Sequence, residues 1–172
     1  YRPAWTSPER VLWTRRIARI LADLLEPGLA GSISTLGGTY RGFPGGGEVL
    51  DRIARGYVEA AGELARIETE TGKRIVLAVE PEPDTTFETA GDAIRFFEDR
   101  LVPAARREPG LLGEGIGRRG IEELLRRHWT VNLDTCHLSV VFRSPAAEMR
   151  LLERAGIGIG KVHVTSALAV RD

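Results

Sequence analysis

The sequence of 172 residues contains a single cysteine, no long apolar run and no excess of either charge. One cysteine excludes a disulfide within the chain and fits a reducing compartment, so we expect a cytoplasmic location. No apolar run approaches the roughly 20 residues that a membrane helix needs, and no signal-peptide pattern is visible, so we expect no membrane insertion. Because 24 Lys and Arg residues balance 24 Asp and Glu residues, charge gives no reason to expect a nucleic-acid partner.

Helical and strand-like segments alternate along the chain. The apolar share of 42% is ordinary for a folded protein, and the length suggests a single domain. Apolar residues recur at helical spacing in five segments, and short apolar runs bounded by turn residues predict four strands. The predicted strands are 29–35, 75–80, 130–135 and 157–165, and the predicted helices lie near 7–24, 53–67, 90–101, 121–125 and 144–155. This alternation implies a parallel sheet with crossover helices.

Alternation within the predicted strands separates an aliphatic face from a polar one. Successive side chains of a strand point to opposite faces, and one face of each strand here is aliphatic, as packing against helices demands. The other face becomes polar toward the C-terminal end, where it carries Glu80, Asp134 and His163. A barrel whose mouth carries chemistry has this arrangement. An open doubly wound sheet also fits, because its ligands gather at the same strand ends.

Three groups of polar residues could support chemistry. Glu80 and Glu82 follow the second strand, Asp134 and His137 follow the third, and His163 ends the fourth. Carboxylate and imidazole groups suit Zn²⁺, Mn²⁺, Co²⁺ or Mg²⁺ without a thiolate. Each residue alone has a simpler interpretation, since an aspartate at a strand end is usually a helix cap and a single histidine is usually packed. Their shared position at three strand ends favours a joint site.

Three short segments carry a resemblance to a known family. Segments 77–81 (LAVEP), 132–137 (NLDTCH) and 161–164 (KVHV) together resemble the xylose isomerase-like TIM-barrel superfamily, which includes sugar isomerases, epimerases and endonuclease IV-type enzymes. Within it, segments 1–5 (YRPAW), 31–35 (GSIST) and 79–84 (VEPEPD) are similar to the EboE group of metabolite-traffic proteins. The resemblance spans nearly the whole chain and implies an α/β fold, a partial (β/α)8 TIM barrel with about four parallel strands and flanking helices. Residues 1–172 would form one partial domain, internal to a longer protein.

The resemblance also implies roles for individual residues. Glu80, Asp134 and His163 fall on divalent-metal ligand positions, and a further acidic ligand would lie beyond Asp172. Glu80 would act as a catalytic acid and base, and His137 falls on a catalytic or substrate-contacting position. The other expected substrate contacts are Ser34, Arg41, Glu82 and Arg171, with Arg41 on the glycine-rich loop 37–47 that we expect to cover the site.

We therefore expect a metal-dependent isomerase- or epimerase-like enzyme in EboE-type metabolite processing or traffic. Its partners would be a small-molecule metabolite and proteins of the same pathway. One alternative is a non-catalytic barrel that serves as a carrier or scaffold. The other is an AP endonuclease-like hydrolase, which is disfavoured because Ser34 and Thr35 stand where the nucleases place a histidine. Ser166 stands where sugar epimerases often carry an acid, so the chain departs from the classical epimerase pattern at this position.

Two expectations concern packing. Trp5, Trp13 and Trp129 are most simply core residues. Four strands of an eight-stranded barrel leave two sheet edges open, so these residues expressed alone should aggregate or pair with another copy.

Overall fold

The computed structural model describes residues 2–43, 45–113 and 116–168. Its strands are β1 (Gly31–Leu36), β2 (Ile75–Glu80), β3 (Trp129–Asp134) and β4 (Ile159–His163). Its α-helices are α1 (Pro8–Leu24), α2 (Gly47–Thr71), α3 (Ala90–Phe96), α4 (Val102–Arg107), α5 (Arg118–His128), α6 (Thr135–Val140) and α7 (Pro145–Ala155). A π-helical turn, η1 (Phe97–Leu101), joins α3 to α4, and a 3-10 turn, η2 (Pro109–Leu111), follows α4.

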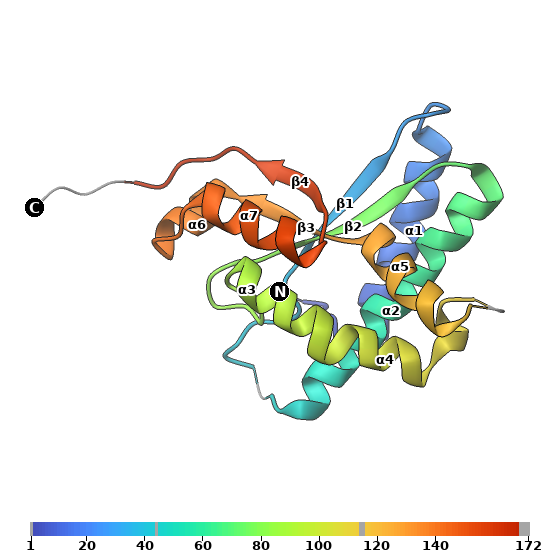
Figure 1. The fold of residues 1–172 in the computed structure, drawn as a ribbon, viewed down its shortest axis with the longest axis horizontal. Coiled ribbons are helices and arrows are strands. Elements are labelled where there is room, and N and C mark those ends of the chain that lie inside the picture. Colours follow the sequence, from blue (N-terminus) through green and yellow to red (C-terminus); the bar gives the residue numbers. More distant parts are fainter. Residues whose placement is uncertain (1, 44, 114–115, 169–172) are drawn as a thin grey trace, which may run out of the picture.

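The four strands form one parallel sheet in the order β1-β2-β3-β4, and the sheet curls into a half barrel with helices along its outer side (Figure 1). The predicted α/β fold, with about four parallel strands of a partial TIM barrel, is confirmed. Each strand is parallel to the one before it because a helical connection returns the chain to the end of the sheet where the previous strand began. Consequently the C-terminal ends of all four strands lie toward the same rim.

Strand register brings the polar strand ends together. Leu36 at the end of β1 lies opposite Glu80 at the end of β2. Asp134 at the end of β3 lies opposite His163 at the end of β4, after a register shift beside Val131. Parallel pairing therefore places residues from distant parts of the sequence at adjacent positions.

Local sequence explains where the helices begin and end. The Ser7 hydroxyl accepts from the backbone of Glu9 at the start of α1, and Thr89 and Asp92 form a capping box at the start of α3. Gly72 and Gly156 end α2 and α7 in the left-handed conformation, which glycine adopts without steric cost.

The core lies between the sheet and the helices and contains a cluster of aromatic rings. The Tyr57 ring centroid lies 4.3 Å from that of Trp5 and 6.1 Å from that of Trp129. The Tyr57 hydroxyl donates to the Leu36 carbonyl at 3.0 Å and accepts from the Gly38 amide at 2.9 Å. Burial raises the pKa of Tyr57 well above its ordinary value, so the hydroxyl stays a neutral donor. This bond joins α2 to the rim end of β1.

The helix predicted at 7–24 is present, but its main apolar stripe does not face the core. Trp13 is 59% exposed and Leu24 is 76% exposed, and Ile17 and Ile20 between them are also exposed. The face that packs is made of smaller residues, namely Val11, Thr14, Ala18 and Ala22. The expectation that Trp13 is a core residue is therefore wrong, whereas Trp5 and Trp129 are fully buried.

The outer face of β4 is uncovered toward its C-terminal end, although Ile159 at its start packs against the core. Val162 and Val164 have the parity of a helix-packed face, yet Val162 is 45% exposed and Val164 is 88% exposed. The expectation that the aliphatic face of every strand packs against helices is therefore wrong for the C-terminal end of this strand. Helix α7 precedes β4, and within the described residues no helix follows it.

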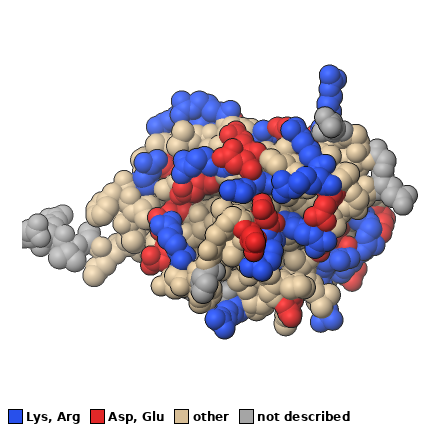
Figure 2. All heavy atoms as spheres, turned by 90° about the horizontal axis from the view of Figure 1, so that it is seen from below, with Lys and Arg blue, Asp and Glu red and all other residues tan. Residues whose placement is uncertain are grey.

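Basic and acidic side chains are interspersed on the face of the molecule seen in Figure 2. The buried carboxylate of Glu63 lies 3.4 Å from Arg15, 2.8 Å from Arg19 and 2.7 Å from Arg66. Burial alone would raise the pKa of Glu63, but Arg66 and Arg19 outweigh burial and hold it below its ordinary value. Among the residues that the structure describes, no helix combines the length and hydropathy needed to cross a bilayer.

Candidate metal centre

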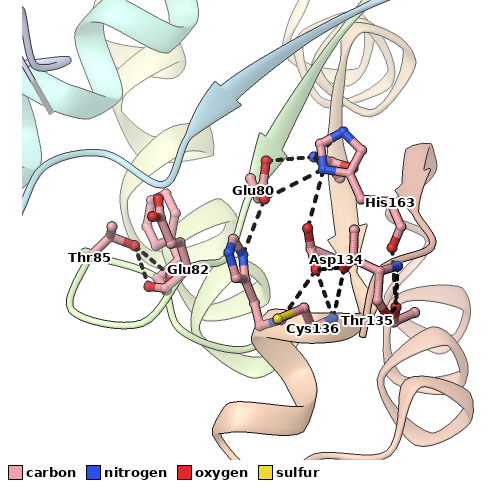
Figure 3. A network of polar contacts seen from close by, with 11 residues as sticks. Glu80, Glu82, Thr85, Asp134, Thr135, Cys136 and His163 are labelled. Carbon is pink, nitrogen blue, oxygen red and sulfur yellow. Dashed lines mark hydrogen bonds and ion pairs between the residues drawn. The ribbon is translucent and has the colours of Figure 1, made fainter. Parts of the chain in front are cut away.

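Polar side chains from three neighbouring strand ends meet at the rim of the half barrel (Figure 3). Glu80 is the last residue of β2, Asp134 the last of β3 and His163 the last of β4. His137 lies in α6, which begins directly after β3. Pro81 follows Glu80 and cannot continue the ladder of hydrogen bonds, so the strand ends at the carboxylate.

One ligand atom each from Glu80, Asp134 and His137 lies within 4.8 Å of the other two. Within this group, Nδ1 of His137 lies 3.1 Å from Oε1 of Glu80. All three side chains are largely shielded from solvent. Two carboxylates and an imidazole at this spacing match the oxygen and nitrogen ligands that divalent cations use in proteins.

The Nδ1 atom of His137 is buried and has no hydrogen-bond partner, although Glu80 is nearby. The 3.1 Å contact therefore lacks hydrogen-bond geometry. Buried polar atoms normally have partners, so an unpaired ring nitrogen beside a carboxylate requires an explanation. A cation between the two groups would satisfy both, and the residues present fit such an ion.

The two oxygens of Asp134 have different surroundings. Oδ1 accepts from the backbone amides of Cys136 at 2.7 Å and His137 at 3.2 Å, and from the Thr165 hydroxyl at 2.6 Å. Asp134 thus caps α6 and ties the end of β4 to it, while Oδ2 lies toward His163. Burial alone would raise the pKa of Asp134, but these three donors outweigh burial and lower it. The carboxylate is therefore held in its charged form.

His163 adjoins both carboxylates. Its Nδ1 lies 3.4 Å from Oδ2 of Asp134 and 3.7 Å from Oε1 of Glu80. The structure thus brings Glu80, Asp134 and His163 to one place, as their strand positions predict. The group whose ligand atoms lie mutually within 4.8 Å contains His137 rather than His163. The ligand role of His163 stays a prediction.

Asn132 is a member of this cluster that the sequence motifs did not single out. Its Nδ2 donates to Oε2 of Glu80 at 2.6 Å and lies 3.2 Å from Nδ1 of His163. The side chain is fully buried, and its Oδ1 has no hydrogen-bond partner. The signal that could have identified it is its parity, because residue 132 faces the same side of β3 as Asp134.

The expected substrate contacts lie in different places. Glu82 lies on the exit loop of β2, apart from Glu80 and Asp134, and its backbone carbonyl accepts from the Thr85 hydroxyl at 2.8 Å (Figure 3). The guanidinium of Arg41 lies 3.2 Å from Glu88, and its backbone amide donates to Asp84 at 2.7 Å.

The glycine-rich loop is thus attached to the exit loop of β2, and these contacts do not show it covering the cluster. Ser34 lies on β1, two residues before Leu36, the register partner of Glu80, and it is exposed. Arg171 lies outside the described residues.

The fold and these side chains define a class of structure, a parallel α/β half barrel with carboxylates and imidazoles at the C-terminal ends of its strands. No family model, no curated protein and no solved structure matches the chain. The resemblance to the xylose isomerase-like superfamily therefore stays a prediction from the three motif segments.

Proposed function

We propose that this chain is the metal-binding part of an isomerase- or epimerase-like enzyme of the xylose isomerase-like type, acting on a small polyhydroxylated or carbonyl metabolite. The observation that carries the proposal is the group of Glu80, Asp134 and His137 ligand atoms within 4.8 Å of one another at the barrel rim. We further propose, from the sequence resemblance, that it works in EboE-type metabolite processing with other proteins of the pathway. We also propose a cytoplasmic location, which the single cysteine supports because it fits a reducing compartment.

Glu80, Asp134 and His137 would hold a divalent cation, with His163 next to both carboxylates. Such an ion, when bound, supplies Lewis-acid polarisation of a substrate carbonyl or hydroxyl group. The ligand set includes no sulfur atom, so Mn²⁺, Zn²⁺, Co²⁺ and Mg²⁺ are the candidates. Thr165 and the first amides of α6 hold Asp134 in place.

Glu80 is the residue that would move a proton in this proposal. Asn132 holds its Oε2 at 2.6 Å, so Oε1 is the oxygen left facing the cluster. A carboxylate in this position can take a proton from a carbon beside a carbonyl and return it to a neighbouring atom. Asn132 is then a positioning residue, because it acts on substrate only through the orientation of Glu80.

Metal binding is the first test. We expect wild-type protein to bind Mn²⁺ or Zn²⁺ at about one ion per chain in calorimetry and elemental analysis. Asp134→Asn and His137→Gln should weaken binding at least 100-fold. Glu82→Gln is the matched control, since it changes a carboxylate of the same loop that lies apart from the cluster (Figure 3). Equal binding by all four proteins would overturn the proposal.

Proton transfer is the second test. Isomerases and epimerases of this chemistry exchange a carbon-bound hydrogen with solvent, so deuterium should enter a sugar or hydroxy-ketone substrate in D₂O. We expect NMR of a panel of aldoses and ketoses to show exchange with metal-loaded wild type and with Glu82→Gln, but not with Glu80→Gln. Metal binding without exchange across the panel would favour the carrier alternative. Cleavage of abasic-site DNA would favour the hydrolase.

A further inference from the structure

A carboxylate that the proposed function does not use lies buried behind the metal cluster. Glu148 belongs to α7, and its side chain is fully shielded from solvent. A hollow of about 10 Å³ lies between it and the end of β3, and the lining of that hollow includes Glu148, Asn132 and Asp134. Such a hollow has room for at most one water molecule, so the carboxylate lies directly behind the strand end that carries the cluster.

The two oxygens of Glu148 bind segments that are far apart in the sequence. Oε2 accepts from the backbone amide of Ala90 at 2.8 Å, where α3 begins. Oε1 accepts from Nε of Arg143 at 2.9 Å and lies 2.8 Å from Nη2 of the same residue. Removing a carboxylate from water is unfavourable unless hydrogen-bonding and charged partners replace the water. The amide and the guanidinium meet that requirement, so each is held at the carboxylate.

The first of these partners, Ala90, lies at the far end of the loop that leaves Glu80. Residues 81–89 join the end of β2 to the start of α3. Pro81, directly after Glu80, lines the same hollow as Glu148, and α3 packs against α7. Glu148 is therefore close to one end of this loop and bound to the other, so it limits where the chain that leaves Glu80 can lie.

The second partner, Arg143, lies at the end of the turn that follows the helix of His137. Its backbone amide donates to the carbonyl of Leu138 at 2.8 Å, so the turn closes on the residue next to His137. Within the turn, Phe142 has a φ of 54°, a left-handed conformation that is unusual for an aromatic residue. Its side chain is 97% exposed, so packing of the ring does not explain this conformation. The turn instead brings the Arg143 guanidinium back to Glu148.

We infer that Glu148 is a positioning residue of the metal centre, because one carboxylate ties the loop that leaves Glu80 to the turn that follows His137. The inference rests on the proposed function, in which those two residues hold a cation. Oε1 of Glu80 and Nδ1 of His137 lie 3.1 Å apart, a spacing that suits neighbouring ligands about 2.1 Å from one ion. Glu148 touches neither of these atoms and acts on them only through the two segments that it joins.

The first experiment is done on the metal-free protein. The sequence has three histidines, His128, His137 and His163, so their ring signals in ¹⁵N NMR can be assigned by substitution. We expect Glu148→Gln to shift the ring signals of His137 and to leave unchanged those of His128, which lies at the opposite end of β3. Glu63→Gln is the matched control, because it neutralises another buried, arginine-paired carboxylate, on α2. Unchanged His137 signals in a folded Glu148→Gln protein would overturn the inference.

The second experiment measures Mn²⁺ affinity by calorimetry, with folding checked by circular dichroism. Glu148→Gln should weaken binding by about 10–100-fold, the usual effect of losing a residue that orients a ligand, and Glu63→Gln should bind as wild type does. Arg143→Met changes a half-exposed side chain and should weaken binding in the same way, which keeps the test open if Glu148→Gln does not fold. Arg143→Lys keeps the charge and should recover part of the loss.

The outcomes separate this inference from the proposed function. Wild-type Mn²⁺ affinity in folded Glu148→Gln and Arg143→Met proteins would overturn the inference alone. A wild-type protein that binds no metal would overturn the proposed function and the inference with it. An equal loss of affinity in Glu63→Gln would also overturn the inference, because the effect would then follow from the loss of any buried carboxylate.

Discussion

The buried ring nitrogen Nδ1 of His137 lies 3.1 Å from Oε1 of Glu80, although one residue belongs to the helix after β3 and the other to the end of β2. Asp134 makes this approach possible, because its Oδ1 accepts from the backbone of His137 and fixes the first turn of α6. The same aspartate leaves Oδ2 toward His163. One side chain therefore organises both the helix start and the polar cluster.

Replacing Asn132 with alanine should weaken metal binding by about 10–100-fold, the usual effect of losing a residue that orients a ligand. Asn132 holds Oε2 of Glu80 at 2.6 Å, and without it the carboxylate gains rotational freedom. Calorimetric titration with Mn²⁺ or Zn²⁺ measures the change. Lys161→Ala serves as control, because residue 161 faces the same side of the sheet at an exposed position. Equal loss in both variants would contradict an orienting role.

Replacing Thr165 with valine should lower the stability of the metal-free protein by about 1 kcal/mol at pH 7, because Asp134 loses one charge-assisted donor. The pKa of Asp134 is below its ordinary value of 3.8, so its stabilisation is present above that pH and is lost as the pH falls through the lower folded-state value. The difference between the two proteins should therefore shrink below pH 3.8. Urea unfolding at several pH values tests this. Thr165→Ser keeps the hydroxyl and should behave as wild type.

His128 should make unfolding pH-dependent near neutrality. It is almost fully buried, with Nδ1 2.9 Å from the Ile75 carbonyl and Nε2 3.3 Å from Glu68. Burial lowers its pKa below the ordinary value of 6.5 and outweighs these two acceptors, which raise it. The neutral His128 ring therefore contributes its full stabilisation above pH 6.5. Below pH 6.5 the free energy of unfolding decreases by at most ~1.4 kcal/mol per pH unit, until the pH reaches the pKa of His128 in the folded state.

The His128→Asn variant tests the contribution of His128 to the pH dependence of stability. It should unfold more easily at pH 8 because it loses packing, and it should show a smaller decrease in stability between pH 7 and pH 5. The free energies of unfolding from urea titrations at these pH values give the comparison. If the free energy of unfolding changes with pH in the variant as it does in the wild type, the pH dependence belongs to other groups.

Two glycines provide a matched test of packing. A Cβ on Gly62 in α2 would lie 2.1 Å from the Leu111 carbonyl oxygen, which is backbone that cannot move aside cheaply. Gly62→Ala should therefore cost about 2 kcal/mol or more. A Cβ on Gly91 in α3 would meet nothing closer than 3.6 Å, so Gly91→Ala should be neutral or stabilise by up to about 1 kcal/mol. In thermal unfolding, the Gly62→Ala variant should therefore have a lower Tm than the Gly91→Ala variant.

The four strands and their common direction were predictable because an apolar run and its flanking turn residues are local signals. The predicted strand at 75–80 coincides with β2, and the strand at 130–135 differs from β3 by one residue at each end. The exposed face of α1 was not predictable, because Trp13 and Ile17 have the spacing of a packed stripe. Only the neighbours of a helix determine which of its apolar faces is buried.

The sequence alone determined the alternation of helix and strand and the parity that sets Glu80, Asp134 and His163 on one side of a parallel sheet. These properties follow from residue spacing and backbone geometry. Tertiary structure decided that His137 joins the two carboxylates and that Asn132 holds Glu80, since strand register and the start of α6 determine those distances. It also decided which apolar surfaces remain open, because burial depends on what lies beside a side chain in space.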